Sequence, residues 1–209
     1  MKHFRLILAL ALVILMAAVS FACSGKEPAV PADSTEDPGT QPANETEVPA
    51  DPTENSGSAD YAGKPFSNDF DMAVIIDGKT YHVRVDSADV LAALGDDREE
   101  DQSISCVYDG YDKTFTYDGI VVSTVPVDGK DVIEMFTITG PAYTTTRNIT
   151  VGATRDEVIA AYGDKYFDDG YLTYTESGTD ADISEMRIQF SFEDDVVSEI
   201  FVYSPSYSN

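Results

Sequence analysis

Segments of alternating apolar and polar residues, joined by short turns, recur along this 209-residue chain from about residue 72 onward. An Asp-Gly pair between two such segments is typical of a two-residue β-hairpin turn. Three hairpins are predicted: 72–76 with 79–85 around Asp77-Gly78, Ile120–Val127 with Lys130–Ile138 around Asp128-Gly129, and 186–192 with Val196–Tyr203 around Glu193-Asp194-Asp195. Hairpins join neighbouring strands in opposite directions, so the pattern predicts antiparallel sheets.

The alternation also predicts which side chains share a face of each sheet. In the first hairpin, Tyr81, Val83 and Val85 are expected on one face, with His82 and Arg84 on the other. In the last hairpin the apolar set is Met186, Ile188, Phe190 and Phe192. One face of each sheet is therefore expected to be buried, as in an α+β fold with one or two short helices per repeat.

An internal repeat is predicted from two similar helical segments. Asp89-Val-Leu-Ala-Ala-Leu-Gly-Asp96 recurs 68 residues later as Glu157-Val-Ile-Ala-Ala-Tyr-Gly-Asp164, with five of eight positions identical. Such similarity at a fixed distance is typical of duplication, and chance similarity of two short helices is the alternative. Each segment precedes a Thr-aromatic-Thr motif (Thr114–Thr116, Thr173–Thr175) and a Glu-x-Phe motif (Glu134–Phe136, Glu199–Phe201). Two tandem repeats, about 66–139 and 140–209, are therefore expected.

Both helices have recognisable ends. Thr154 with Glu157 matches a capping box, and Gly163 stands where a helix commonly ends on a residue with positive φ. The earlier helix has Ser87 as its candidate N-cap and Gly95 as its stop.

The second half resembles a known family. Ile149-x-Val-Gly152-x-Thr154-x-x-Glu157-Val158-x-x-x-Tyr162-Gly163, followed by antiparallel strands, resembles the tandem-repeat fold of β-lactamase-inhibitor-protein-like domains and the related small envelope lipoproteins of the SmpA/OmlA family. The resemblance covers residues 148–203 well. It covers the first half only through the helix and hairpins, because residues 86–89 lack the Gly-x-Thr start. It implies a non-enzymatic domain that grips a protein through a sheet face or loops.

The N-terminus predicts export and lipidation. Lys2 and Arg5 precede a 14-residue apolar run, and Ala22 precedes Cys23, as in a bacterial lipoprotein signal peptide spanning residues 1–22. Ser20 departs from the Leu that is usual there. Cys23 would carry the lipid and hold the protein at the extracytoplasmic side of a cell membrane. The run is short for a permanent membrane helix, which needs about 17–25 residues, and a retained anchor is the alternative.

Residues 23–62 contain six of the ten prolines and almost nothing large and apolar. Such a segment cannot bury enough surface to fold, so a disordered acidic stalk, or a plain linker, is expected there. Residues 63–209 are long enough for the two-repeat α+β domain.

Acidic residues dominate the predicted domain. Residues 63–209 hold 10 Lys and Arg against 29 Asp and Glu, a net charge of −19. This charge disfavours nucleic acid as a partner. It suits either cationic proteins and divalent ions or simple solubility.

No catalytic, cofactor-binding or metal-ligating residue is assigned from the sequence. His82 is expected on a solvated strand surface, and zinc, phosphate-loop and nucleophile-elbow motifs are absent. Cys106 is expected in the core, with a reactive thiol or an intermolecular disulfide as alternatives. Two acidic stretches, 96–101 and 164–170, are the places where calcium is possible, although neither has EF-hand spacing.

The sequence thus predicts a lipid-anchored, non-catalytic binding module for an unidentified envelope or secreted protein. A carboxylate-based hydrolase acting on cell-wall glycan or peptide, and a calcium-responsive adhesion module, are the alternatives. Candidate contact residues are tyrosines that could equally lie in the core: Tyr108, Tyr111, Tyr171 and Tyr174.

Overall fold

The computed structural model describes residues 58–205, which form an α+β fold with antiparallel sheets, as predicted. The helices are α1 (Ser58–Tyr61), α2 (Asn68–Asp71), α3 (Ala88–Leu94) and α4 (Arg155–Tyr162). The strands are β1 (Ala73–Ile76), β2 (Lys79–His82), β3 (Glu99–Ile104), β4 (Tyr111–Tyr117), β5 (Ile120–Val127), β6 (Lys130–Ile138), β7 (Thr144–Thr145), β8 (Phe167–Asp168), β9 (Leu172–Tyr174), β10 (Arg187–Glu193) and β11 (Val196–Tyr203).

The strands form two sheets. Eight strands make the large sheet in the order β3-β4-β5-β6-β11-β10-β9-β8, and β2-β1-β7 make a small one. Along the chain, α3 is followed by the strands β3 to β6, and α4 is followed by the strands β8 to β11. Each set of four strands forms a meander in the large sheet. The last strands of the two meanders, β6 and β11, pair at the centre, with Ile138 opposite Ile200.

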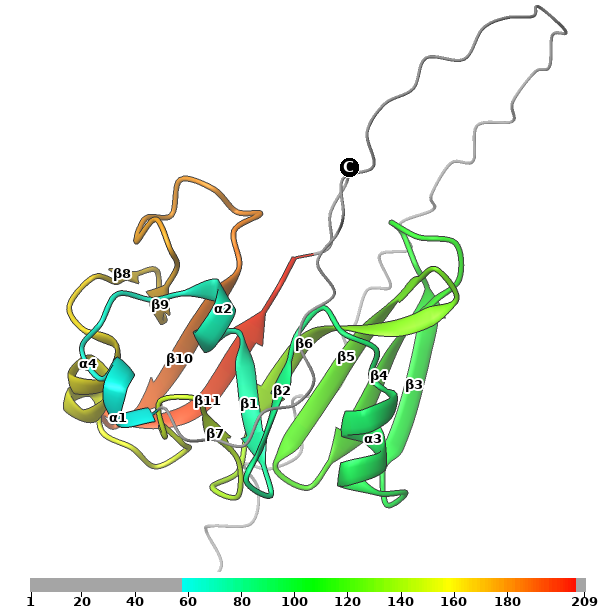
Figure 1. Cartoon of the computed structure of the whole chain (residues 1–209), viewed down its shortest axis with the longest axis horizontal. Coiled ribbons are helices and arrows are strands. Elements are labelled where there is room, and N and C mark those ends of the chain that lie inside the picture. The colour runs from blue at the N-terminus through cyan, green and yellow to red at the C-terminus, as the bar shows by residue number, and fades with distance from the viewer. Residues whose placement is uncertain (1–57, 206–209) are drawn as a thin grey trace, which may run out of the picture. The chain divides into compact units, whose positions relative to one another are not determined.

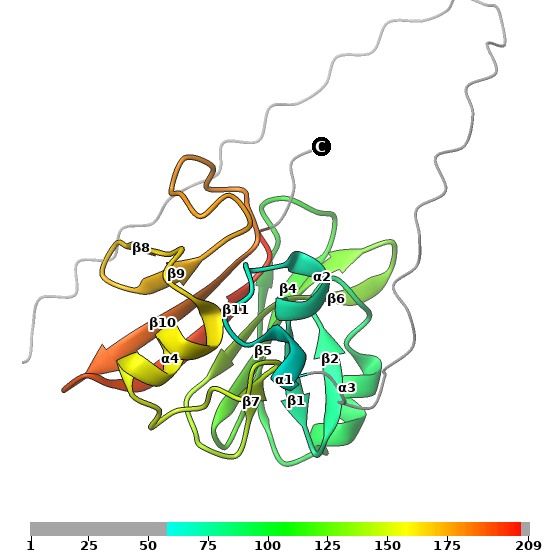
Figure 2. The same cartoon turned by 60° about the vertical axis from the view of Figure 1, so that its left-hand side comes forward.

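The helices and the small sheet lie on the same side of the large sheet (Figures 1 and 2). Side chains from that side and from one face of the large sheet form the core. Tyr162 of α4 lies 5.1 Å from Tyr174 and 5.3 Å from Phe190, measured between ring centroids, and all three are almost completely buried. A short helix such as α4 gains most of its stability from this kind of contact.

The hairpins follow the predicted turns. Asp77 and Gly78 both have positive φ, as do Asp128 and Gly129, which is the conformation of a type I′ turn. Asp194 and Asp195 also have positive φ at the β10–β11 turn. The second strand of the first hairpin is shorter than expected, because β2 ends at His82.

The N-terminus of α4 has the predicted capping box. The Thr154 side chain accepts a hydrogen bond from the Glu157 backbone N–H, and the Glu157 carboxylate accepts one from the Thr154 backbone N–H at 2.7 Å. Gly163 ends the helix with a φ of 85° and donates its N–H to the Ile159 carbonyl.

Helix α3 begins directly after Ser87, its predicted N-cap, but the Ser87 side chain does not cap it. Ser87 is buried in helical backbone geometry and makes no capping hydrogen bond. The Asp86 carboxylate accepts the Ala88 N–H at 3.1 Å instead. Residues 84–87 also pair with β6, since the Ser87 N–H donates to the Asp131 carbonyl, and this pairing fixes the backbone at the helix start.

The Glu-x-Phe motifs do not occupy matching positions. Phe136 lies opposite Val202 and Phe201 lies opposite Thr137, so the two phenylalanines belong to adjacent cross-strand pairs. Adjacent pairs point to opposite faces of a sheet. Phe136 is therefore in the core, whereas Phe201 is on the other face.

The ordered fold begins before residue 63. Helix α1 starts at Ser58, and the ring of Tyr61 stacks on Phe70 with a centroid distance of 3.7 Å. The Gly63 N–H donates to the Ala161 carbonyl at 2.9 Å. Residues 58–62 therefore belong to the folded part and not to the stalk.

Candidate functional site

The side of the large sheet away from the helices is the candidate site. Cross-strand neighbours share a face, so the register identifies its side chains. One row crosses all eight strands: Glu99, Thr116, Val121, Thr137, Phe201, Gln189, Thr173 and Phe167. A second row holds Asp101, Thr114, Ser123, Met135, Tyr203 and Arg187, and a short third row holds Glu199 and Ser191. We call these three rows, with Tyr171, the open face.

Among residues 58–205, neither a helix nor the small sheet covers the open face (Figures 1 and 2). Val121, Met135 and Phe201 are half-buried, whereas Val122, Phe136 and Val202, which point the other way, are fully buried. The contrast arises because the helices and the small sheet cover only one side of the sheet, although Thr137 and Thr173 of the open face are also buried.

An aromatic pair, Tyr171 and Phe201, lies on the open face. The ring of Tyr171 meets Phe201 edge to face at 5.8 Å and 89°. Tyr171 keeps 38% of its surface exposed. Rigid aromatic side chains of this kind supply much of the contact energy at protein interfaces.

Carboxylates outnumber cations on the open face. Glu99, Asp101 and Glu199 lie in its rows, against the single cation Arg187. The Arg187 guanidinium is already engaged, because it donates to the backbone carbonyls of residues 182, 183 and 185. The face therefore favours a positively charged partner.

Glu199 is distinctive among these carboxylates. It is half-buried, and desolvation raises the pKa of its carboxyl group above the ordinary value. Its cross-strand neighbour on β10 is Ser191, and Phe201 lies two residues along β11 on the same face. No described residue makes a hydrogen bond or ion pair with its carboxylate.

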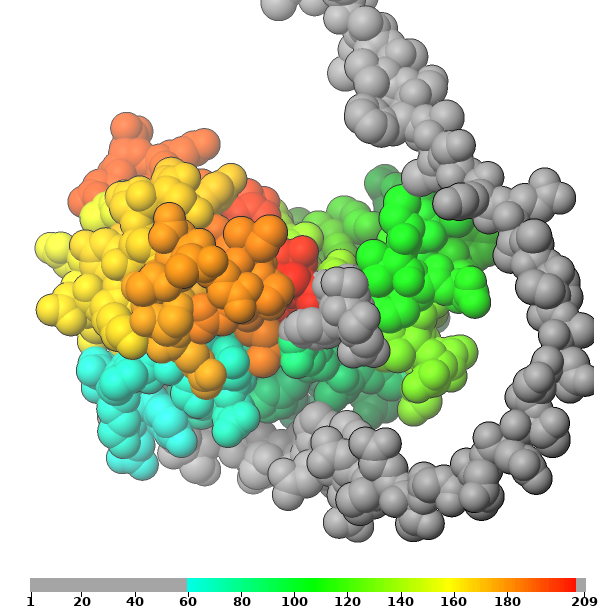
Figure 3. Space-filling model, turned by 90° about the horizontal axis from the view of Figure 1, so that it is seen from above, coloured from blue at the N-terminus to red at the C-terminus, as the bar shows by residue number. Residues whose placement is uncertain are grey.

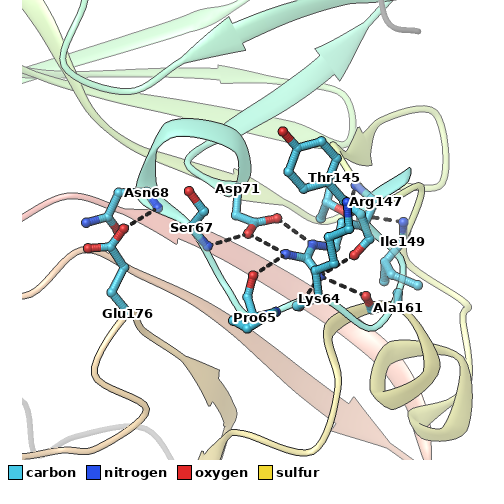
Figure 4. Close-up of polar contacts among 11 residues, drawn as sticks. Lys64, Pro65, Ser67, Asn68, Asp71, Thr145, Arg147, Ile149, Ala161 and Glu176 are labelled. Carbon is cyan, nitrogen blue, oxygen red and sulfur yellow. Dashed lines mark hydrogen bonds and ion pairs between the residues drawn. The ribbon is translucent and has the colours of Figure 1, made fainter. Parts of the chain in front are cut away.

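A second polar cluster lies in the core and contains Arg147, just after β7 (Figure 4). The Arg147 guanidinium binds both carboxylate oxygens of Asp71 at 2.7 Å. It also donates to four backbone carbonyls, those of Tyr61, Lys64, Pro65 and Ala161. Because these groups satisfy one another, the cluster holds the N-terminal segment against α4 and offers no free group to a ligand.

The expectation for Cys106 is wrong, and the structure separates the four candidate tyrosines. Cys106 is exposed on the loop between β3 and β4 and not buried in the core, because that hairpin extends beyond the covered part of the sheet. Tyr174 is completely buried and therefore follows the core alternative that the sequence left open for it. Tyr111 and Tyr171 are exposed, and Tyr108 is half-buried.

Two further residues singled out in the sequence are His82 and Cys23. His82 is half-buried, and this burial lowers the pKa of its imidazole, which Asp69 partly opposes. Cys23, the predicted lipidation site, lies outside the described residues.

The acidic stretches do not gather their carboxylates. Asp96 lies 3.6 Å from Arg98, and Asp101 is in β3. In the second stretch, Asp169 accepts a hydrogen bond from the Thr173 hydroxyl. Among residues 58–205 no three acidic, histidine or cysteine side chains are grouped to hold a metal ion.

The sequence reasoning missed Arg147 and the open face. The alternation in residues 196–203 was available as a signal, because it separates Ile200 and Val202 from Phe201 and Tyr203. Arg147 had no local signal, since Asp71 is 76 residues away.

None of the described helices has the length and apolar character needed to cross a membrane. No protein-family model matches the chain, and searches of curated proteins and of solved structures find no match.

Proposed function

We propose that this protein is a lipid-anchored extracytoplasmic binding module that binds another protein through the open face, without catalysis. The observation that carries the proposal is the partly exposed apolar and aromatic surface formed by Val121, Met135, Phe201 and Tyr203. An exposed apolar patch rimmed by polar residues is typical of a protein interaction site.

The order of elements supports a relation to β-lactamase-inhibitor-protein-like domains and SmpA/OmlA-type lipoproteins. Each half has a helix followed by a four-stranded meander. We propose that residues 66–139 and 140–209 are tandem repeats that joined their last strands into one sheet. The resemblance supports a protein as the partner.

We further propose that Cys23 carries the lipid and that residues 24–57 hold the folded part away from the membrane. The signal-peptide pattern before Cys23 and the Pro-rich composition after it support this arrangement. The partner is then an envelope or secreted protein.

The geometry supports binding over the hydrolase alternative. A glycosidase needs two carboxyl groups flanking one bond. The buried Asp71 is fully engaged by Arg147, and the neighbour of Glu199 on β10 is Ser191. The calcium alternative is tested by melting the protein with and without the ion, since specific binding raises the unfolding temperature.

Capture from envelope and secreted extracts tests the proposal. The full-length protein and its Val121→Asp and Met135→Asp variants are immobilised and compared at moderate salt. A charge buried at the centre of an interface is costly, so both variants are expected to lose the captured partner.

Ile183→Asp is the matched control. Ile183 is 83% exposed on the loop between β9 and β10, outside the three rows of the open face, and the charge change is the same. Melting curves establish that all variants fold. Equal loss of the partner in Ile183→Asp, or full retention in both open-face variants, contradicts the proposal.

A further inference from the structure

We propose that Glu199 is the anchor on the open face for an arginine or lysine side chain of the partner. The inference rests on the proposed function and specifies the partner as a protein with a basic contact patch.

The surroundings of Glu199 suit a cation with an apolar stem. Phe201 lies on the same side of β11, two residues further on, and its ring contacts Tyr171 at 5.8 Å. Arginine and lysine combine a charged head with an aliphatic chain that packs on such rings. A cation within about 6 Å of an aromatic ring is also attracted by the ring itself.

The carboxylate of Glu199 has lost part of its hydration without gaining a counter-charge. It is half-buried, and none of residues 58–205 donates a hydrogen bond to it or forms an ion pair with it. Desolvation is the cause that raises the pKa of its carboxyl group. A guanidinium or ammonium group placed there would form an ion pair with the carboxylate. This ion pair would offset the desolvation cost that the unbound protein carries at Glu199.

The remaining charges of the face argue against a second copy of this chain as the occupant. A second copy would bring Glu99, Asp101 and Glu199 toward the same carboxylates, with Arg187 already engaged by backbone carbonyls. Like charges at an interface disfavour association. A basic protein would instead bring positive charges toward these carboxylates.

Titration with a small probe tests the anchor directly. Isotope-labelled full-length protein is titrated with N-acetyl-arginine amide and, separately, with the uncharged isostere N-acetyl-citrulline amide, and followed by NMR. Saturable shifts are expected at Ser191, Glu199 and Phe201 with the arginine probe only. Glu199→Gln is expected to weaken the arginine probe about tenfold, since the replacement keeps the shape and removes the charge.

Asp180→Asn is the matched control for charge. Asp180 is exposed on the loop between β9 and β10 and is not in any row of the open face, so the variant removes one negative charge from outside the face and is expected to bind the probe unchanged. Equal weakening by Asp180→Asn, or equal shifts with the citrulline probe, would falsify the anchor.

Stability provides a second readout. Because the folded state raises the Glu199 pKa, protonation is favoured on folding, and the ionised group opposes folding once the pH rises through the raised value. Glu199→Gln is therefore expected to raise the unfolding temperature at pH 7, with the gain disappearing below the ordinary Glu pKa of about 4.3. A glutamate that merely supported the fold would lower that temperature at pH 7 when replaced, which would overturn the inference.

The capture assay separates the anchor from the broader proposal. A partner that binds Glu199→Gln at full strength but is lost in Met135→Asp overturns the anchor and leaves the open face as the binding site. A partner that is indifferent to both substitutions overturns both.

Discussion

At the scale of single residues, Arg147 and Asp71 carry the largest energetic consequence. Both side chains have at most 1% of their surface exposed, and their hydrogen bonds join residues from three separate segments. Breaking a buried ion pair by removing one partner leaves an uncompensated buried charge. The pair is therefore needed to hold the segment from Tyr61 to Asp71 against α4.

Asp71→Asn and Arg147→Met are each expected to lower the free energy of unfolding by about 3–5 kcal/mol, the usual range for one lost partner of such a pair. The double substitution Asp71→Asn with Arg147→Met is expected to cost clearly less than the sum of the two single changes, because no charge remains unpaired. Urea unfolding measures both quantities. Strict additivity would show that the two side chains are not coupled.

Predictability at this scale depended on whether a residue's surroundings are local. Glu157 was identified correctly because its capping partner Thr154 is three residues away. Cys106 was misplaced because its exposure depends on how far the β3–β4 hairpin extends past the covering elements, which no neighbouring residue encodes.

At the scale of elements, the two helices of similar sequence begin differently. In α4 the Thr154 and Glu157 side chains satisfy each other's backbone N–H groups, whereas α3 begins at a segment held by pairing to β6. A capping side chain matters most where no tertiary contact replaces it.

Thr154→Ala is expected to lower the free energy of unfolding by about 1 kcal/mol, the typical value for loss of an N-cap side chain. Ser87→Ala, the corresponding change in α3, is expected to cost less, because the Ser87 side chain makes no capping hydrogen bond. Chemical denaturation of the two variants compares them directly. A larger loss in Ser87→Ala would contradict this account.

At the scale of the whole folded part, the N-terminal segment from Ser58 to Asp71 belongs to the second half of the domain as much as to the first. Figure 3 shows these residues packed directly against the elements that follow residue 150, and the Gly63–Ala161 and Arg147–Ala161 hydrogen bonds join them. The residues that precede β1 therefore contact α4, which lies much later in the chain.

A chain beginning at residue 63, the boundary predicted from composition, is therefore expected to be less stable than one beginning at residue 58. It loses the Tyr61–Phe70 stack and the Tyr61 carbonyl that accepts from Arg147. We expect a loss of about 1–2 kcal/mol, from one aromatic pair and one charged hydrogen bond. Thermal and urea unfolding of the two chains measure this loss of stability. Identical stability would show that residues 58–62 contribute nothing and that the folded part begins at residue 63.

The sequence by itself determined the hairpins at Asp77-Gly78 and Asp128-Gly129, the two helix stops and the buried face of β10, because turn geometry and alternation depend on residues a few positions apart. Only the tertiary structure decided that β6 pairs with β11, that Phe201 stands on the open face, and that Arg147 finds Asp71. Those outcomes depend on which surfaces far apart in the chain bury each other, and the free energy of that choice belongs to the packed molecule and not to any short segment.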